Sequence, residues 1–146
     1  MSRASEFYFV DIFVAADKVH RYTDRFETAQ QFLYSELEWD ATLRELEIIG
    51  EAANALLKQQ SIDEKYRSIV NFRNHITHAY FGIDEEIVWE VVTTLLQAFV
   101  NELILLIQKE NLDLSDAIAS AKKDYAYSDE ICRFLDRLTV KLMMEK

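Results

Sequence analysis

The sequence predicts an all-α fold, an antiparallel bundle of five to six helices. Proline is absent from the 146 residues, and glycine occurs only at Gly50 and Gly82. A β-rich domain of this size needs many more turn-forming residues, so this composition favours long helices with few breaks. Half of the residues are hydrophobic, which is enough apolar material for one packed core. We therefore expect residues 1–146 to form a single helical domain.

Residues 5–25 form the first expected helix, because their apolar residues recur at helical spacing. The stripe on one face consists of Phe9, Ile12, Phe13, Ala16, Val19 and His20. His20 is therefore expected to be partly buried, in the core or at an interface. Thr28 is a suitable N-cap for a short helix that ends near Leu33.

A longer helix begins at Ser35 or Asp40 and runs to about Gln59. Its expected buried face consists of Leu43, Leu46, Ile49 or Gly50, Ala53, Leu56 and Leu57. Glycine within a helix costs about 1 kcal/mol relative to alanine. Gly50 therefore indicates a place where another helix approaches closely.

Ser61 and Glu64 match a capping box, which predicts the start of the next helix. That helix carries the segment Arg-Asn-His-Ile-Thr-His-Ala-Tyr at residues 73–80 near its C-terminal end, and Gly82 is the expected stop. Arginine, asparagine and histidine stand close together there, so this segment is the candidate functional centre of the chain.

Asp84 caps the following helix, which extends to about Asn111. Apolar residues cover much of its circumference, so it is expected to lie at the centre of the bundle. Polar residues interrupt its most hydrophobic stretch, residues 91–107, which is typical of a core helix and not of a membrane span. The apolar faces of the helices together exceed what one small bundle can cover, so we expect a dimer.

Residues 110–146 form a helical extension beyond this bundle. Asp113 or Ser115 begins a short segment that ends near Lys123, and Ser128 caps a last amphipathic helix. Three roles are open for the extension: it buttresses the bundle, covers a dimer cleft or binds a partner.

The formal net charge of −10 makes the chain a poor generic binder of nucleic acids, because phosphate affinity comes from clustered lysine and arginine. Acidic residues concentrate in residues 36–51, whereas Lys65, Arg67 and Arg73 are expected to make the surroundings of the candidate segment locally positive. The single Cys132 cannot form an internal disulfide, and no signal peptide is evident, so a cytoplasmic location is expected.

Arg73, Asn74 and His78 suit the cleavage of RNA without a metal ion. Histidine is the side chain best able to take a proton from the ribose 2′-hydroxyl near neutral pH. Arginine supplies a rigid cation, and asparagine a neutral donor, for the negative charge that develops on phosphorus. Asn74 and His78 share a helix face, and Arg73 lies about 140° from His78 at about 100° per residue. A homodimer with this helix at its interface would place two copies of each group in one cleft.

By residue type alone, a solvated helix face is the more common role for such polar residues. His75 is interpreted in that way, as a neighbour on the opposite face. Trp39 and Trp89 are expected in the core, and not as a surface on which bases stack. A cluster of metal ligands, a glycine-rich phosphate loop and a nearby serine or cysteine nucleophile are all lacking around the segment, so no metal or cofactor is expected.

The wider pattern resembles the HepT-like family of the HEPN superfamily, small helical toxins of prokaryotic toxin–antitoxin pairs. Residues 44–53 are similar to the family pattern R-x-L-x-I-I-G-E-A, and residues 72–83 to its signature R-N-x-x-x-H-x-Y-F-G. Residues 86–92 match the start of the next family helix. The likeness covers about residues 5–108 as a HEPN-like core, and the extension lies past the usual family end.

The resemblance implies a helical homodimer with a composite endoribonuclease cleft, in which Arg73 and His78 match the catalytic pair and Asn74 stands beside the arginine. It also implies a minimal nucleotidyltransferase antitoxin of the MntA type, which inactivates the toxin by attaching AMP to Tyr80. Two alternatives stay open. One is a non-catalytic substrate-binding subunit of such a nucleotidyltransferase, which the acidic charge favours. The other is a helical structural subunit whose segment only packs the dimer.

Overall fold

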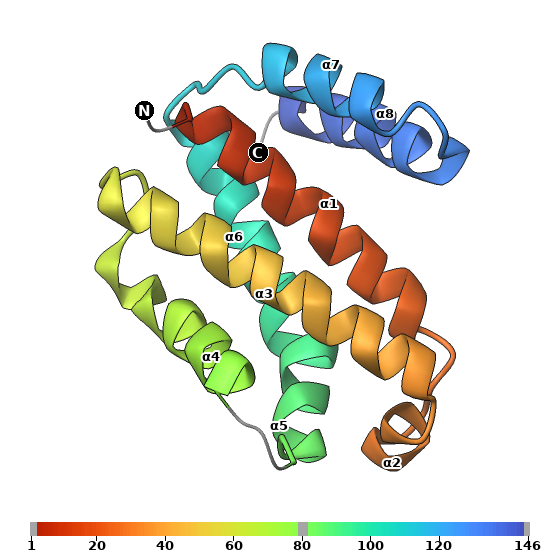
Figure 1. Ribbon diagram of the computed structural model, residues 1–146. Helices are drawn as coiled ribbons and strands as arrows, with labels where there is room; N and C mark the ends of the chain where they lie inside the picture. The colour runs from red at the N-terminus through yellow and green to blue at the C-terminus, as the bar shows by residue number, and fades with distance from the viewer. Residues whose placement is uncertain (1–2, 79–81, 145–146) are drawn as a thin grey trace.

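The computed structural model describes residues 3–78 and 82–144, and all regular structure in those residues is helical. Figure 1 shows that the helices over Ser5–Thr23 and Glu36–Lys58 lie side by side and antiparallel, and that the other helices pack around this pair. The all-α bundle expected from the sequence is confirmed. Its described part holds seven helices when the three consecutive segments from Glu85 to Lys109 are counted as one.

Helix α1 (Ser5–Thr23) is covered on more than one side, by α3 and by the helices near the C-terminus. Four residues of the expected stripe, Phe9, Ile12, Phe13 and Val19, are therefore buried, and Ala16 is partly buried. Val10 and Val14, which lie beside the stripe, are buried as well. His20 is exposed in this single chain, between the buried residues Val19 and Thr23, so its expected place in the core is wrong and its place at an interface stays a prediction. Thr28 caps α2 (Ala29–Leu33) as expected, because its side-chain oxygen accepts a hydrogen bond from the Gln31 backbone N–H at 3.1 Å.

Helix α3 (Glu36–Lys58) follows Ser35, and its inner face carries most of the residues expected there. Leu43 is only partly buried, whereas Leu46, Ile49, Gly50, Ala53, Leu56 and Leu57 are buried. Trp39 and Trp89 both pack against Phe32 of α2, with ring centroids 4.9 and 6.0 Å away, so their assignment to the core region is confirmed.

The entry to α4 (Arg67–His78) differs from the expected capping box. Asp63 caps a short 3₁₀ turn, η1 (Glu64–Tyr66), by accepting from the Lys65 backbone N–H at 2.8 Å. The Ser61 hydroxyl hydrogen-bonds the Ser5 hydroxyl at 2.6 Å instead. Gln60, with φ +58°, directs the chain towards the start of α1, so Ser61 joins two helix ends and does not begin one.

Gly82 is the first described residue after α4 and has φ +72°, the left-handed conformation that a glycine adopts readily past a helix end. Asp84 then caps a continuous helix by accepting from the Glu86 N–H at 2.9 Å, as predicted. The helix consists of α5 (Glu85–Glu90), a π-helical segment η2 (Val91–Leu95) and α6 (Leu96–Lys109).

The expected central position of the α5–η2–α6 helix is wrong, because only one side of it meets the bundle. Val88, Phe99, Leu103 and Ile107 are buried, whereas Ile87, Leu95 and Leu105 are about half exposed, at 46%, 50% and 51%. By length and composition alone, Glu85–Lys109 is apolar enough to cross a membrane, and 28% of its most apolar window is buried. The helix therefore presents an apolar surface that this single chain leaves uncovered.

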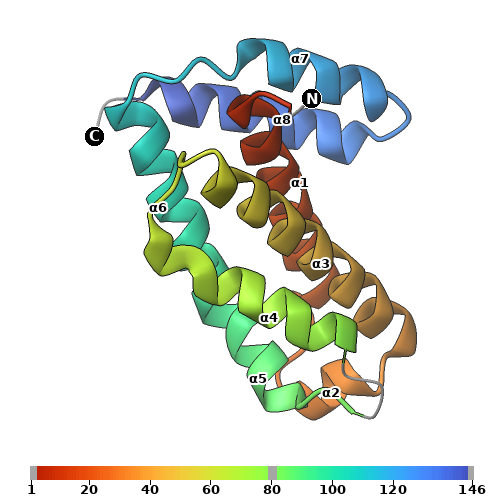
Figure 2. The same ribbon diagram turned by 60° about the vertical axis from the view of Figure 1, so that its left-hand side comes forward.

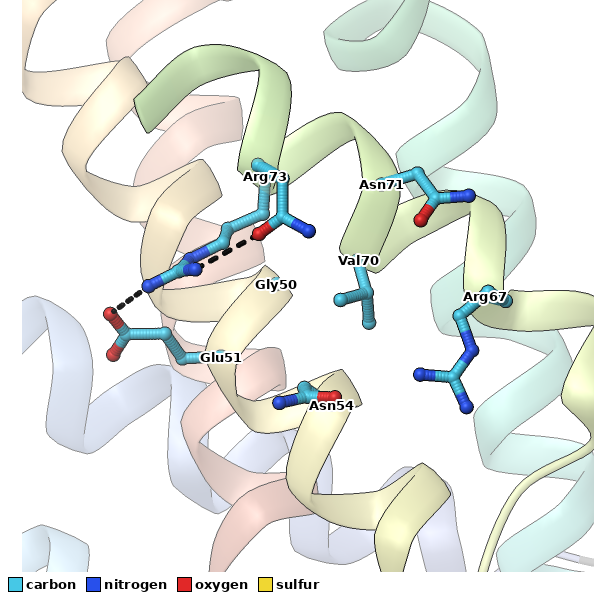
Figure 3. Close-up of a pocket in the computed structure, with 8 residues that line it drawn as sticks. Gly50, Glu51, Asn54, Arg67, Val70, Asn71 and Arg73 are labelled. Atoms are coloured by element: carbon cyan, nitrogen blue, oxygen red, sulfur yellow. Dashed lines mark hydrogen bonds and ion pairs between the residues drawn. The ribbon is translucent and has the colours of Figure 1, made fainter. Parts of the chain in front are cut away.

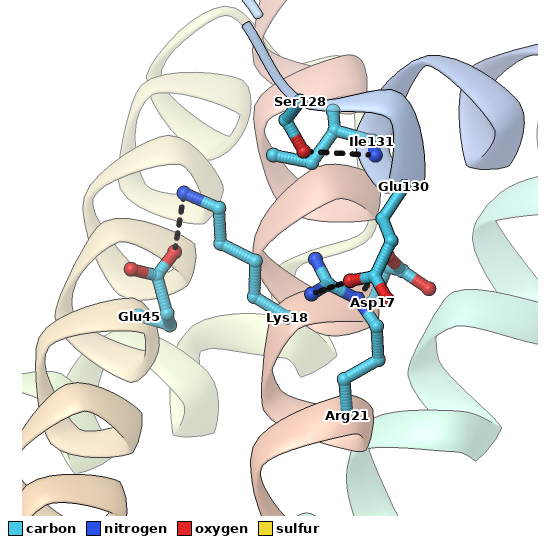
Figure 4. Close-up of polar contacts among 7 residues, drawn as sticks. All are labelled: Asp17, Lys18, Arg21, Glu45, Ser128, Glu130 and Ile131. Carbon is cyan, nitrogen blue, oxygen red and sulfur yellow. Dashed lines mark hydrogen bonds and ion pairs between the residues drawn. The ribbon is translucent and has the colours of Figure 1, made fainter.

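Helices α7 (Ser115–Asp124) and α8 (Asp129–Met143) form a hairpin across one end of the bundle, and both views place the end of α4 towards the other end (Figures 1 and 2). Polar contacts join this hairpin to α1 (Figure 4). Arg21 binds Asp17 at 3.1 Å and Glu130 at 2.6 Å. The Lys18 ammonium lies 5.0 Å from the centre of the Tyr125 ring. Of the three roles open for the extension, the contacts within the chain show buttressing.

Candidate functional site

Helix α4 holds the candidate segment against α3 through its apolar residues. Val70 and Ile76 are buried, and Ile69 and Phe72 are partly buried against the same core. Arg73 and Asn74 lie in the last turns of the helix, and His78 is its final residue. The placement of the segment near the helix C-terminus is therefore confirmed.

Gly50 of α3 lies directly beneath Arg73 of α4. A Cβ added at Gly50 would overlap with Cβ and Cγ of Arg73. No side chain larger than hydrogen fits at this crossing, so the close helix approach that Gly50 predicted is confirmed, and the neighbour is Arg73 itself.

Polar groups on both helices hold the Arg73 guanidinium. Its Nη2 donates to Glu51 Oε1 at 3.2 Å, and its Nη1 donates to Asn74 Oδ1 at 3.0 Å. The Arg73 side chain is 30% exposed, whereas that of Glu51 is 60% exposed. Glu51 of α3 thus restrains one side of the Arg73 guanidinium, which remains accessible to solvent.

Sequence reasoning placed Glu51 in a family-like block but did not assign it to the site. Its position next to Gly50 was the available signal. Where a glycine of one helix lies against a side chain of a second helix, the residue after that glycine is well placed to contact the same side chain.

A cavity of about 280 Å³ lies between α3 and α4, and we call it the polar cavity (Figure 3). Its lining is formed by Gly50, Glu51, Asn54, Arg67, Val70, Asn71, Arg73 and Asn74. Figure 3 shows the Arg73–Glu51 pair at one end and Arg67 at the other, with Val70 between them. Two of the predicted site residues, Arg73 and Asn74, therefore meet at one cavity.

Two other predicted residues are not tested by these contacts. The side chain of His78 and the whole of Tyr80 lie outside what the structure describes, so their roles stay predictions. His75 is exposed and does not line the polar cavity, in line with its exclusion from the site. Among the described residues, no group of three or more His, Cys, Asp or Glu side chains is arranged to hold a metal ion.

The positive surroundings expected from Lys65, Arg67 and Arg73 are wrong, because each cation has a carboxylate partner. Lys65 binds Glu102 at 3.3 Å, and Arg67 binds Glu64 at 2.7 Å. The Lys65–Glu102 hydrogen bond raises the pKa of Lys65, which keeps this lysine charged. Glu102 and Glu51 are distant in sequence from their partners, so a count of charges along the segment did not include them.

The opposite flank of α4 borders a second hollow of about 440 Å³, which we call the apolar groove. It lies between α4 and the α5–η2–α6 helix, with Leu46 and Ile49 of α3 among its lining residues. The apolar residues from the two flanking elements are Ile69, Phe72, Ile87, Val91, Leu95, Leu96, Ala98 and Phe99. The helix that carries the candidate segment thus has a polar cavity on one flank and an uncovered apolar groove on the other.

Comparison with known proteins gives a consistent family. The model of a family described as "Ribonuclease HepT-like" matches residues 12–109. "Probable ribonuclease HepT" of Thermococcus cleftensis is 32% identical over 95 residues, which cover 63% of this chain and 86% of that protein. "Putative RNase MJ1380" of Methanocaldococcus jannaschii is 30% identical over 88 residues, covering 58% and 80% of the two chains.

No solved structure matches this chain. The family match ends at the last residue of α6, so α7 and α8 lie beyond it, while α3 and α4 lie entirely within it. Because the matched region spans more than half of the chain and contains both helices that form the polar cavity, the chain belongs to the HepT-like ribonuclease family.

Proposed function

We propose that this chain is a HepT-type toxin of the cytoplasm, an endoribonuclease that cleaves RNA without a metal ion through Arg73, Asn74 and His78. The observation that carries the proposal is the restrained guanidinium of Arg73, which Glu51 and Asn74 hold at the edge of a polar cavity. Relatives that share this region bear ribonuclease names, which supports the same class of reaction here.

The proposed reaction needs a base and a stabilised transition state. His78 accepts the proton of the ribose 2′-hydroxyl, and the 2′-oxygen attacks the adjacent phosphorus. The bond from phosphorus to the 5′-oxygen breaks, and that oxygen takes up a proton from water as it leaves. Arg73 and Asn74 donate hydrogen bonds to the phosphoryl oxygens as their negative charge increases. The products are a 2′,3′-cyclic phosphate and a 5′-hydroxyl end.

A homodimer is part of the proposal, because one histidine and one arginine provide few groups for acid–base catalysis. The apolar groove beside α4 supports it, since exposed Ile87 and Leu95 border a concave surface of the kind that a second copy covers. Pairing along this flank brings two α4 helices close together, and the two copies of Arg73 and His78 share one cleft where the C-terminal ends of these helices meet.

Inactivation by a partner is the last part of the proposal. A minimal nucleotidyltransferase of the MntA type would join AMP from ATP to the Tyr80 oxygen, with diphosphate as the leaving group. Tyr80 stands two residues after His78. A bulky anion at that position would fill the cleft and repel the phosphates of RNA.

The experiment is cleavage of RNA by the purified protein in the presence of EDTA, with the ends of the products identified. We expect 2′,3′-cyclic phosphate ends from the wild type and at least about a 100-fold lower rate in Arg73→Ala and His78→Ala. His75→Ala, one turn away and outside the cavity, is the matched control and should keep the rate. Full cleavage by His78→Ala would contradict the assigned base.

The pairing of every cation beside α4 with a carboxylate favours one second candidate, a non-catalytic subunit that presents its segment to a nucleotidyltransferase. The intact mass of protein produced together with that enzyme separates the two. Addition of AMP without any RNA cleavage by the unmodified protein would support the second candidate and contradict the first.

A further inference from the structure

The polar cavity extends along α4 well beyond Arg73 and Asn74, the two of its lining residues that the proposed cleavage uses. Arg67, Asn71 and Asn74 follow one another at intervals of four and three residues, so they occupy one face of the helix. Position 78 continues this spacing by four more residues. At about 1.5 Å per residue, the stripe from Arg67 to Asn74 is about 10 Å long. Asn54 of α3 faces the stripe across the cavity (Figure 3).

Several hydrogen-bonding groups that line the cavity are not used by the fold. Within the described residues, the side-chain amides of Asn54 and Asn71 bond to no other protein group. Arg67 uses Nε and Nη2 on a single oxygen of Glu64, at 2.9 and 2.7 Å, and its Nη1 lies outside that pair. The cavity therefore offers two amides, each with two donors and an acceptor, and one additional cationic donor.

These groups match the chemistry of one nucleotide unit. An amide that both donates and accepts can pair with the edge of an unstacked base, which is how proteins read single-stranded RNA. A guanidinium suits a phosphate oxygen. The volume of about 280 Å³ is just below that of pockets for drug-sized ligands, so the cavity admits a single nucleotide and no duplex.

We propose that the polar cavity is a subsite for one nucleotide next to the cleaved bond, in which Asn54 and Asn71 read the base and Arg67 contacts its phosphate. This inference rests on the proposed ribonuclease function and deepens it. Cleavage then has a base preference at one position on one side of the broken bond. The strand runs along α4 from the last turn, which holds the proposed reacting groups, towards the first.

The test of base reading uses a pool of RNA oligonucleotides randomised around the cleaved position, with the product ends sequenced. We expect the wild type to prefer one base at one flanking position, and Asn54→Ala and Asn71→Ala to reduce that preference by about 10-fold. Gln30→Ala, an exposed amide on α2, is the control and should leave it unchanged. An unchanged preference in both cavity variants overturns the inference while the cleavage itself still supports the proposed function.

The test of phosphate contact measures binding of RNA that carries 2′-deoxyribose at the cleaved position, so that it cannot react. Arg67→Ala should weaken binding and reduce the slope of log affinity against log salt by about 0.7. Arg67→Lys should restore part of the slope, and Arg133→Ala on α8 should change neither quantity. Equal slopes in Arg67→Ala and wild type would overturn the phosphate contact, and this readout holds even for protein that cleaves nothing.

A free mononucleotide is the other source of the same chemistry. AMP and CMP should compete with the uncleavable RNA, and Asn54→Ala with Asn71→Ala should weaken this competition. If these variants lose mononucleotide binding but keep the RNA cleavage pattern, the cavity serves a free nucleotide and the RNA subsite is refuted.

Discussion

The α-carbon of Gly50 lies so close to the Arg73 side chain that no methyl group fits between them. The crossing of α3 and α4 is thereby tied to the position of one functional side chain. Any side chain that replaces the hydrogen of Gly50 must displace Arg73, the whole of α4, or both.

Gly50→Ala tests that relationship. Alanine gains about 1 kcal/mol of helix propensity over glycine, but overpacking at a tight crossing costs about 1–3 kcal/mol. We expect a small net loss of stability in urea unfolding. We also expect RNA cleavage to slow by at least about 10-fold, because a displacement of a catalytic group by about 1 Å lowers the rate by that much or more. Ala55→Gly on α3 is the control, because it lowers stability through propensity and leaves Arg73 in place. An equal loss of activity in both variants would attribute the effect to stability alone.

Glu51→Ala should separate the positioning of Arg73 from the binding of RNA. Loss of the carboxylate frees one side of the guanidinium, so kcat should fall about 10-fold. The KM for RNA should not rise, because a negative charge near the phosphates is removed as well. Glu51→Gln keeps an acceptor and should recover most of kcat. Stability should change by no more than about 1 kcal/mol, since the Glu51 carboxylate is 60% exposed and solvent screens the ion pair. A raised KM with an unchanged kcat would contradict the positioning role.

Leu95→Glu should disrupt the proposed dimer, because it places a charge in the apolar groove. Sedimentation velocity should show a monomer, and RNA cleavage should fall with the dimer. Leu105→Glu is the matched control, since Leu105 is exposed to the same degree on the same helix but does not line the groove. A monomer with full activity would refute a site shared between two copies.

Glu45 should give the stability a measurable dependence on pH. Burial raises the pKa of this carboxyl, and Lys18 and Arg44 lower it by less. The folded state then holds the proton more tightly than the unfolded state, in which the pKa of the carboxyl is near 4.5. The stability contribution is present below pH 4.5 and is lost as the pH rises through the raised value. Thermal unfolding should therefore show Glu45→Gln gaining stability relative to the wild type between pH 4 and pH 7, and a difference that does not vary with pH would contradict this.

Leu135→Ala should loosen the C-terminal hairpin without touching the site. Leu135 is fully buried on α8, and such truncations cost about 2–5 kcal/mol. Urea unfolding should show that loss, whereas RNA cleavage below the unfolding transition should stay within about twofold of the wild type. Reduced activity in fully folded protein would show that the hairpin does more than buttress the bundle.

Periodicity and capping residues were sufficient to predict most of the fold. Thr28, Asp84 and Ser128 each cap the helix expected of them, because a cap depends on residues within one turn. The cap predicted at Ser61 was wrong, because the Ser61 hydroxyl hydrogen-bonds Ser5, which is distant in sequence and becomes a neighbour only in the folded chain. His20 is exposed between the buried residues Val19 and Thr23, because a helical stripe does not show where the covered face of a helix ends.

The sequence predicted where two of the proposed site residues lie, but it did not predict the charges around them. The sequence located Arg73 and Asn74 and identified Gly50 as a close approach, but it could not pair the two observations. The carboxylates of Glu51 and Glu102 reach α4 from other helices, so the electrostatic surroundings of the segment depend on tertiary structure.

The π-helical segment from Val91 to Leu95 has a consequence for how this chain tolerates insertions and deletions. A π turn accommodates one residue more than an α turn, and the Thr93 hydroxyl donates to the Trp89 carbonyl there at 2.6 Å. Deletion of one residue within it would therefore restore a regular α-helix and leave α5 and α6 in nearly the same alignment, with Ile87 still in the wall of the apolar groove. Deletion of one residue from the regular α-helical part would instead turn the residues on its two sides by about 100° relative to each other. The π-helical segment is thus the place in this helix where the loss of one residue should disturb the groove least.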